Sequence, residues 1–141
     1  MHIKAGEYKV IIDNNGNQST YDANGNLIHY KDTNGYGFWY AFDVNGNQIH
    51  YKNSTGYESW RDYDANGNEI HYKNSTGNES WADYDANGNL IHCKTSNGYE
   101  FWYDANGNKI TKEEFDRIHN PLTCEDKIIE IDGKQYKLTA I

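Results

Sequence analysis

Histidines recur at one position of a repeated phrase and are the first candidates for chemistry in this sequence. The column consists of His29, His50, His71 and His92. Equivalent strands two apart in a sheet lie roughly 9–10 Å from each other, whereas one metal ion needs ligand nitrogens about 2.1 Å away. Neighbouring histidines of the column therefore cannot share an ion. We expect a surface ladder that pairs with Asp or Glu and titrates near neutrality, and we expect no metal and no cofactor.

Acidic and amide side chains form a second candidate, because segment 64–68 reads Asp-Ala-Asn-Gly-Asn and is similar to the start of a calcium loop. An EF-hand needs Gly at its sixth position and Glu at its twelfth, but here Gly is fourth and Ser75 is twelfth. Paired carboxylates such as Asp62 and Asp64 recur with the repeat, whereas a catalytic pair is needed once. The sequence also has no Ser-His-Asp set and no Gly-rich phosphate loop before a helix. We predict no calcium site and no enzyme.

Tryptophan forms a further column, and its aromatic neighbours extend it. A continuous aromatic stripe on an uncovered sheet face marks an interaction surface, and Tyr and Trp are favoured anchors in protein interfaces. The alternative is that the column only packs within the sheet. We predict an aromatic binding face made of Trp39, Trp60, Trp81, Trp102, Tyr51 and Tyr72. We predict that its acidic rim is made of Asp62, Asp83, Glu58 and Glu79.

An internal repeat must position these columns. Its Asn-Gly-Asn glycines are Gly16, Gly25, Gly46, Gly67, Gly88 and Gly107; those from Gly25 to Gly88 are 21 residues apart, the step to Gly107 is 19 and the step from Gly16 is 9. Runs rich in aromatic and β-branched residues flank each Asn-Gly, which is a strong hairpin signal. A second Gly-bearing turn follows at 73–78, so the chain reverses twice per repeat. The apolar spacing of two excludes helix and predicts an antiparallel meander.

Two turn geometries are compatible with segment 64–68. A type I′ turn would centre on Asn66-Gly67, whereas a type I turn with a following left-handed Gly would begin at Asp64 and place Gly67 fourth. Asp recurs at this first position, where its carboxylate can cap backbone N–H groups. That recurrence favours the type I turn.

The two turns predict different faces for the flanking side chains. The type I turn predicts one face with Trp60, Ile70 and Tyr72, and another with Tyr63, Glu69, His71 and Lys73. The type I′ turn would move Tyr63 alongside Ile70 and Tyr72 and send Trp60 across.

The ends of the chain differ from the array. Residues 1–20 are predicted to form an N-terminal cap, 21–110 the hairpin array, and 111–141 a C-terminal cap. Thr111 and Glu114 match a helix capping box, and Asn120-Pro121 should stop that helix. A hairpin on Asp132-Gly133 should follow, with one apolar face made of Ile129, Ile131, Tyr136 and Leu138. We therefore predict a mainly-β fold: an elongated antiparallel β-meander of hairpin repeats with a small C-terminal helix-plus-hairpin cap.

Composition limits both the core and the partners. Leu, Ile, Val and Phe make up roughly 16% of the chain, a level typical of disorder, but 13 Tyr and 4 Trp can bury large areas. We expect a thin protein of one sheet layer. A net charge of −8 argues against direct binding to nucleic acid or an anionic membrane. With no signal peptide or apolar span expected, Cys93 and Cys124 are interpreted as free thiols in a reducing compartment.

The phrase Tyr63-Asp64-x-x-Gly67-Asn68-x-Ile70 resembles the YD repeat of Rhs-type proteins, whose unit opens Tyr-Asp-x-x-Gly. Similar short arrays occur in bacterial and prophage reading frames, and the resemblance covers about 20–110. It implies serial β-hairpins without catalysis in the repeats. The chain is too short for the closed shell of the large Rhs proteins and carries no toxin domain. Segment 99–107 is also similar to choline- and glucan-binding repeats, but lacks their second Gly-Trp.

Two function classes remain open on the sequence alone. The first is a non-enzymatic protein-binding repeat protein, namely a small acidic inhibitor of phage anti-defence (anti-CRISPR-like) or toxin-immunity type that blocks a basic, nucleic-acid-handling bacterial target. The second is a carbohydrate- or cell-wall-binding repeat module. We expect a basic protein partner, no nucleic acid or membrane partner, and a cytoplasmic location in a bacterial host. Two copies could also associate through the exposed sheet face.

Overall fold

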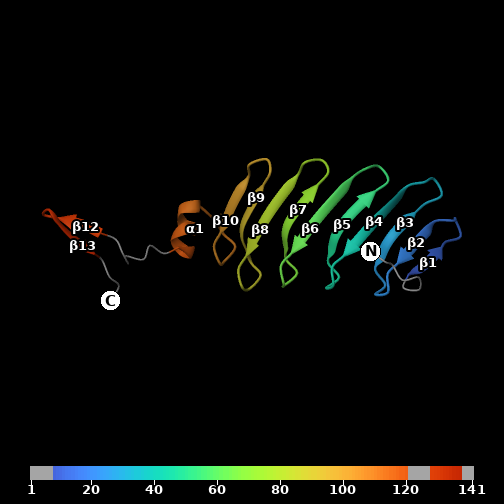
Figure 1. Ribbon diagram of the computed structural model, residues 1–141, viewed down its shortest axis with the longest axis horizontal. Coiled ribbons are helices and arrows are strands. Elements are labelled where there is room, and N and C mark those ends of the chain that lie inside the picture. The colour runs from blue at the N-terminus through green and yellow to red at the C-terminus, as the bar shows by residue number, and fades with distance from the viewer. Residues whose placement is uncertain (1–7, 121–127, 138–141) are drawn as a thin grey trace.

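Every strand of the main sheet pairs with its neighbours in the sequence, which gives an antiparallel meander of eleven strands (Figure 1). The computed structural model describes residues 8–120 and 128–137. The strands are β1 (Lys9–Ile12), β2 (Gln18–Tyr21), β3 (Leu27–Lys31), β4 (Gly37–Phe42), β5 (Gln48–Asn53), β6 (Glu58–Tyr63), β7 (Glu69–Asn74), β8 (Glu79–Tyr84), β9 (Leu90–Thr95), β10 (Glu100–Tyr103) and β11 (Lys109–Ile110). The predicted mainly-β hairpin meander is confirmed.

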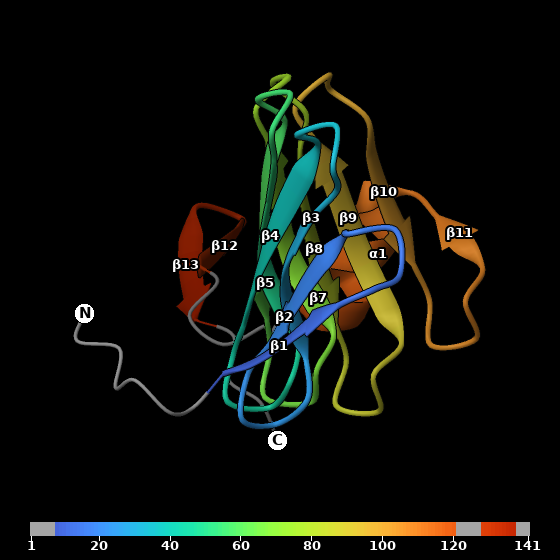
Figure 2. The same cartoon turned by 90° about the vertical axis from the view of Figure 1, so that its right-hand side faces the viewer.

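The sheet has a single layer, and within residues 8–120 and 128–137 no second sheet packs on either of its faces (Figure 2). Among the described residues no apolar side chain is buried, and the buried polar side chains are Ser59 and Asn74. The expectation of a thin protein without a thick core is confirmed. Stability must therefore come from cross-strand pairs and from half-buried aromatic rings rather than from an interior.

The Asp-x-Asn-Gly segments form type I turns followed by a left-handed glycine. In the turn at Asp64, the Gly67 amide donates to the Asp64 carbonyl at 3.1 Å and the Asp64 amide donates to the Asn68 carbonyl at 2.9 Å. Gly67 has φ 86°, and among the described non-glycine residues only Asp132 has a positive φ. The type I geometry is therefore confirmed, because a type I′ turn would also place Asn66 at positive φ.

The Asp64 carboxylate is the cap that the recurrence of Asp predicts. Its Oδ1 accepts hydrogen bonds from the amides of Asn66 and Asn68, and its Oδ2 accepts one from the Asn68 side chain, each at 2.9 Å. The Asn68 side-chain bond, followed by the amide bonds, lowers the pKa of Asp64 below its ordinary value. Asn53 and Asn74 cap the turns at the other edge of the sheet in the same way.

The predicted faces are wrong although the turn type is right. Trp60 lies opposite Lys73, and Tyr72 lies opposite Arg61, so Trp60 and Tyr72 point to opposite faces. Tyr63 follows Arg61 by two positions along β6 and shares the face of Tyr72. The separation of Trp60 from Tyr72 is what the rejected type I′ turn predicts, whereas Tyr63 and Glu69 share a face, as the type I turn predicts.

A second irregularity beside the turn explains the error. Tyr63 lies opposite Glu69, but the next residue, Asp62, lies opposite His71, so that Ile70 is one residue too many in β7. Such a bulge sends every following side chain to the other face. The same register shift occurs between β2 and β3, between β4 and β5, and between β8 and β9. The turns at the opposite edge lead into strand pairs without a shift.

The bulge keeps equivalent residues of successive repeats on one face. Across the strands, His50 lies opposite Trp60 and Trp60 opposite Lys73, so these three residues form one row. His71 is two positions from Lys73 and therefore shares the face of His50. Without the bulge, Tyr72 would take the place of Lys73 in this row, and His71 would point to the opposite face. Because both turns of a repeat enclose five residues, from Lys52 to Glu58 and from Tyr63 to Glu69, an odd period of 21 residues requires one extra residue in each repeat.

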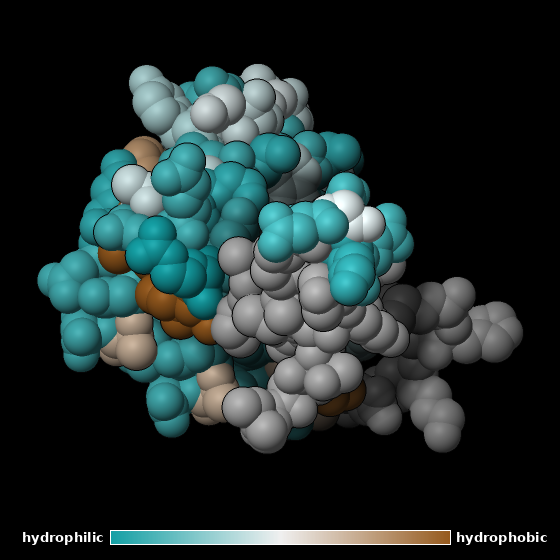
Figure 3. Space-filling view, turned by 90° about the vertical axis from the view of Figure 1, so that its left-hand side faces the viewer, coloured by the Kyte–Doolittle hydropathy of each residue, from teal (hydrophilic) through white to brown (hydrophobic). Residues whose placement is uncertain are grey.

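A helix follows the last strand. α1 (Lys112–His119) begins after Thr111, whose side chain accepts from the Glu114 amide while the Glu114 carboxylate accepts from Thr111, as predicted for a capping box. The Phe115 ring lies 6.3 Å from the ring of His92, so α1 packs against the end of the sheet beside β10. Seen from this end of the molecule, the coloured surface is mostly hydrophilic with small separate apolar areas (Figure 3).

A separate hairpin, β12 (Ile128–Ile131) and β13 (Lys134–Lys137), forms on the Asp132-Gly133 turn, as predicted. Asp132 and Gly133 both have positive φ, 52° and 72°. The predicted apolar face of Ile129, Ile131, Tyr136 and Leu138 lies outside the described side chains and residues. Cys93 is a free thiol, whereas Cys124 lies outside the described residues.

Changes at the turn should separate the roles of its two central residues. Gly67→Val should lower the free energy of unfolding by about 1–3 kcal/mol, because a β-branched residue resists positive φ. Asn66→Ala should cost much less, because Asn66 has negative φ. Urea denaturation of both variants measures the difference. Equal losses would contradict the type I geometry.

Candidate functional site

Tryptophan and histidine share one face of the sheet, which we call the Trp face. Cross-strand pairing places a repeated series of side chains in each diagonal row. The most complete row runs from β6 to β10 and contains Asp62, His71, Trp81, Lys94 and Glu100. The preceding rows contain Ala41, His50, Trp60, Lys73 and Glu79, and then Thr20, His29, Trp39, Lys52 and Glu58. Each indole of these three rows thus lies between an imidazole and a lysine side chain, whereas Trp102 lies between His92 and Ile110.

Each tryptophan stacks on the histidine of the preceding strand. The ring centroids are 4.9 Å apart for His29–Trp39 and 5.5 Å apart for the pairs His50–Trp60, His71–Trp81 and His92–Trp102, with interplanar angles of 18° to 21°. Near-parallel rings at this separation interact favourably beyond the area that they bury. The stacking fixes the orientation of side chains that are otherwise open to solvent.

Carboxylates contact both ring nitrogens of His71 and His92, the last two histidines of the column. The Nδ1 of His71 lies 3.0 Å from Asp62 Oδ2, and its Nε2 lies 2.8 Å from Glu79 Oε1. His92 is held in the same way by Asp83 at 2.8 Å and Glu100 at 2.9 Å. The predicted ladder of histidines paired with acids is confirmed for these residues. Among the described residues, no group of three or more His, Cys, Asp or Glu side chains is arranged to hold a metal ion.

The pairing weakens toward the N-terminus because the acids are missing from the sequence. His50 contacts Glu58 at 2.9 Å, but the position opposite it in β4 is Ala41. His29 lies opposite Thr20, and its buried Nε2 has no hydrogen-bond partner. Among the described residues, the number of carboxylates that contact each histidine therefore rises along the Trp face, from none at His29 in β3 to two at His71 in β7 and at His92 in β9.

Two carboxylates around one imidazole favour its protonated form, because neutral imidazole carries a single N–H. The hydrogen bonds to Asp62 and then to Glu79 raise the pKa of His71 above its ordinary value of 6.5. Burial lowers the pKa of His92, but hydrogen bonds to Asp83 and Glu100 outweigh it, so this pKa is also raised. The positive charge of the Trp face therefore depends on pH in the neutral range.

The indole rings remain exposed despite the stacking. Trp39 is 42% exposed, and Trp60 and Trp81 are each 40% exposed. Trp102 is half-buried and lies in β10, against which α1 packs. Three fixed and exposed tryptophans on an uncovered sheet face are the principal candidate for a binding site.

Two residues predicted for the aromatic face lie on the opposite side. Tyr51 and Tyr72 point to the face that also carries Phe38 and Tyr40, which we call the Tyr face. There the hydroxyls of Tyr57 and Tyr72 are 2.8 Å apart and the Asn74 side chain donates to Tyr72 at 3.1 Å. The physical reason for the correction is the bulge residue, which reverses the side of every position after the turn.

The predicted acidic residues lie among the indoles rather than outside them. Asp62 and Glu79 flank His71, Asp83 binds His92, and Glu58 binds His50. The histidines and the tryptophans, predicted as separate columns, form one surface. The equal spacing of the two columns, together with the odd period, contains the signal that would have joined them.

Comparisons with known proteins find structures that resemble the repeat array. No family model matches this chain, and no curated protein matches it. Two solved structures are similar to 67% of the chain at 25% identity and a TM-score of 0.53: the Photorhabdus luminescens Tc holotoxin pore with a mutated TccC3, and the crystal structure of TcdB2-TccC3-TEV. The matched part covers 5% of each of those chains. In the described residues, no helix has the length and apolar character needed to span a membrane.

The histidine pairs should make the stability of the sheet depend on pH. Because the pKa values of His71 and His92 are raised on folding, their contribution is fully present below the ordinary pKa and is lost as pH rises through the raised one. We expect the urea midpoint to fall as the pH is raised from the ordinary histidine pKa of 6.5 into the alkaline range. The double variant His71→Gln with His92→Gln should lose this dependence. A wild-type midpoint that rises over the same range would contradict the pairing.

The array is therefore a β-hairpin repeat, and its similarity to the two Tc toxin structures supports a repeat like the YD repeats of Rhs-type proteins.

Proposed function

We propose that this protein is a non-enzymatic binding protein whose Trp face docks a protein partner. The observation that carries the proposal is the combination of exposure and fixed orientation in Trp39, Trp60 and Trp81. An anchor that is already ordered loses less side-chain entropy on binding than a mobile one. Large aromatic side chains of this kind supply most of the energy in many interfaces.

The charge of the protein suggests the chemistry of its partner. The net charge is −8, and the carboxylates of Asp62, Asp83 and Glu79 lie on the Trp face, where they contact His71 and His92. A basic partner surface would be steered toward such a face and would pair with its acids. We therefore propose a small acidic inhibitor that acts in the bacterial cytoplasm on a basic, nucleic-acid-handling target. Phage anti-defence and toxin immunity are the two roles that such an inhibitor would fit.

The geometry of the rows favours a protein over a carbohydrate. Sugars stack on the flat face of an aromatic ring, but the Trp60 indole has His50 stacked on one side and Lys73 as its cross-strand neighbour on the other. The exposed part of the ring is then largely its edge, which suits insertion between the side chains of a protein surface. Carbohydrate binding remains the alternative outcome of the experiments below.

Removing two central indoles should abolish binding while the sheet stays folded. Tagged wild-type protein and the double variant Trp60→Ala with Trp81→Ala would be compared as baits in bacterial lysate, with quantitative mass spectrometry. Tyr36→Ala is the matched control, because Tyr36 is 39% exposed and contacts Phe38 on the Tyr face. We expect a partner that the wild type and the control retain and the double variant loses more than tenfold. Equal capture by all three baits would assign the Trp face to packing alone.

Charge reversal should affect the rate of association with the same partner. Asp62→Lys with Asp83→Lys should slow association and reduce its dependence on salt, because steering acts through long-range charge. Surface plasmon resonance at low and high salt measures both effects. Binding that needs the tryptophans but ignores both the charge reversal and the salt would support the carbohydrate alternative.

A further inference from the structure

The two ends of the sheet differ in how their edges are covered. At the C-terminal end, β11 has two residues and α1 follows it and packs against β10. At the other end, β1 is an edge strand whose four residues are all exposed. Three of its four side chains are apolar: Val10 is 50%, Ile11 42% and Ile12 68% exposed. Proteins usually protect edge strands with charges, proline or a covering element, and β1 has only Lys9.

The free hydrogen-bonding groups of this edge can be assigned from the pairing. The Asp13 amide donates inward to the Asn17 carbonyl, and the register continues with Ile11 opposite Ser19 and Lys9 opposite Tyr21. In an antiparallel pair, alternate residues point their N–H and C=O groups to opposite sides. Val10 and Ile12 therefore direct theirs away from β2, where no described strand lies.

We propose that β1 is the dimer interface of this protein, and that two copies pair antiparallel through β1 about a two-fold axis. Because only Val10 and Ile12 offer outward groups, the outward residues of the two copies must face each other. This restricts the register to shifts of two residues. The interface is self-complementary, so the same patch serves both copies and the assembly closes as a dimer.

Charge selects one of these registers. When Val10 of one copy faces Ile12 of the other, Ile11 faces Ile11 across the axis and Lys9 faces Asp13 at both ends. Opposite charges and β-branched pairs directly across a strand pair both stabilise it. A shift by two residues in either direction would place Lys9 or Asp13 opposite Ile11 and leave that charge without a partner. The chosen register therefore satisfies both the apolar and the charged residues of β1.

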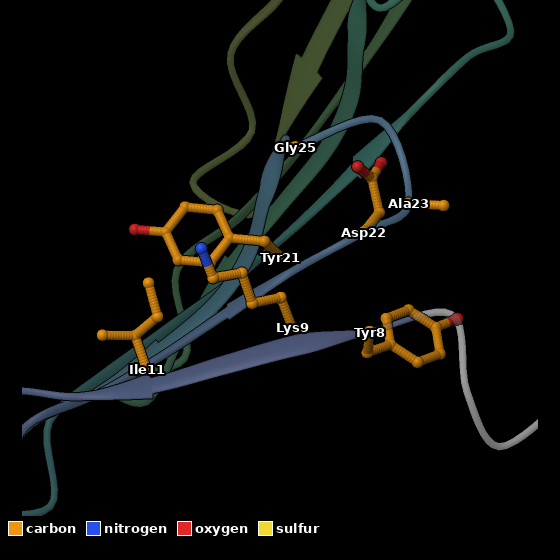
Figure 4. A pocket seen from close by; sticks show the side chains of 7 residues that line it. All are labelled: Tyr8, Lys9, Ile11, Tyr21, Asp22, Ala23 and Gly25. Carbon is orange, nitrogen blue, oxygen red and sulfur yellow. The ribbon is translucent and has the colours of Figure 1, made fainter.

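A hollow beside the edge has room for the second copy. It has a volume of about 660 Å³ and is lined by Tyr8, Lys9, Ile11, Tyr21, Asp22, Ala23 and Gly25. Lys9, Ile11 and Tyr21 rise from the same side of the β1–β2 hairpin (Figure 4). In the proposed register, Asn14 of the second copy lies opposite Tyr8, so the turn that follows its β1 would lie at this hollow. The dimer would join two meanders into one continuous sheet and leave both Trp faces uncovered by β1.

Sedimentation equilibrium over a wide concentration range tests the proposal. The wild type should dimerise, and Val10→Pro should be monomeric because proline removes the outward N–H. Val10→Ala is the matched control, since it shortens the side chain but keeps that N–H and should still dimerise. Circular dichroism should show the same β content in all three proteins. A wild type that stays monomeric to its solubility limit, or a Val10→Pro variant that dimerises like the wild type, would overturn the proposal.

Disulfide trapping tests the register itself. In a Cys93→Ser, Cys124→Ser background, Ile11→Cys should form a covalent dimer on mild oxidation, because directly opposite residues of a non-hydrogen-bonded pair are close enough to bridge. Ile12→Cys should not, because it faces Val10. Equal trapping of both variants, or of neither, would reject the register.

Removing the charge of Asp13 tests the proposed ion pair with Lys9 through the dissociation constant of the dimer. Asp13→Asn should keep the turn, since Asn53 and Asn74 cap equivalent turns, but should weaken the dimer about three- to tenfold by removing two ion pairs. An unchanged dissociation constant would remove the charge pairing from the proposal.

Discussion

One extra residue per repeat is the constraint on which the rest of this sheet depends. Side chains alternate between faces with a period of two, and the repeat has an odd length. A regular meander of this length would therefore reverse its faces at every repeat. The bulge at Ile70 and its counterparts in the other repeats absorb the odd residue. Only because of them do His71 and His92 lie opposite Asp62 and Asp83, and only because of them does Trp60 lie opposite Lys73.

The sheet stands without a core because polar groups connect its repeats. The Tyr63 hydroxyl donates to the Gln48 carbonyl at 3.1 Å, and the Tyr84 hydroxyl donates to the Glu69 carbonyl at 3.2 Å. At the opposite edge, the Ser75 amide donates to the Glu58 carbonyl while the Ser75 hydroxyl accepts from the Glu58 amide. These bonds repeat along the array and do not need a second layer. They leave both faces free, which is what a protein that binds through one face requires.

The sequence was sufficient to predict the meander and the turn, because both depend on local chemistry. The Asp64 carboxylate can cap backbone amides and Gly67 can adopt a positive φ, and these two properties together indicate this type of turn. The faces could not be predicted in this way, since Ile70 is an ordinary strand residue and nothing in its chemistry marks a bulge. The same one-residue error misplaced Tyr51 and Tyr72 and hid the stacking of His50 on Trp60. Comparison between repeats would have revealed it, because the assumed register and the pairing of His71 with Trp81 would together put Trp60 and Trp81 on opposite faces, although one face was predicted for both.

The bulge also determines how such a chain can change its length. The short strands β2 and β10 each span four residues, whereas the equivalent strands β6 and β8 of the central repeats span six. The strands at both ends of the array are therefore shorter than the central ones by two residues, which is an even number. The last turn, at Asp104, leads into a strand pair without a register shift, and no further repeat follows it whose faces would have to agree. Within the array, a loss or gain of one residue would turn every later strand over, whereas pairs of residues and whole repeats leave the faces intact. Length variation among arrays of this kind should therefore come in even steps or in complete units, and the number of tryptophans presented would be set by the number of units.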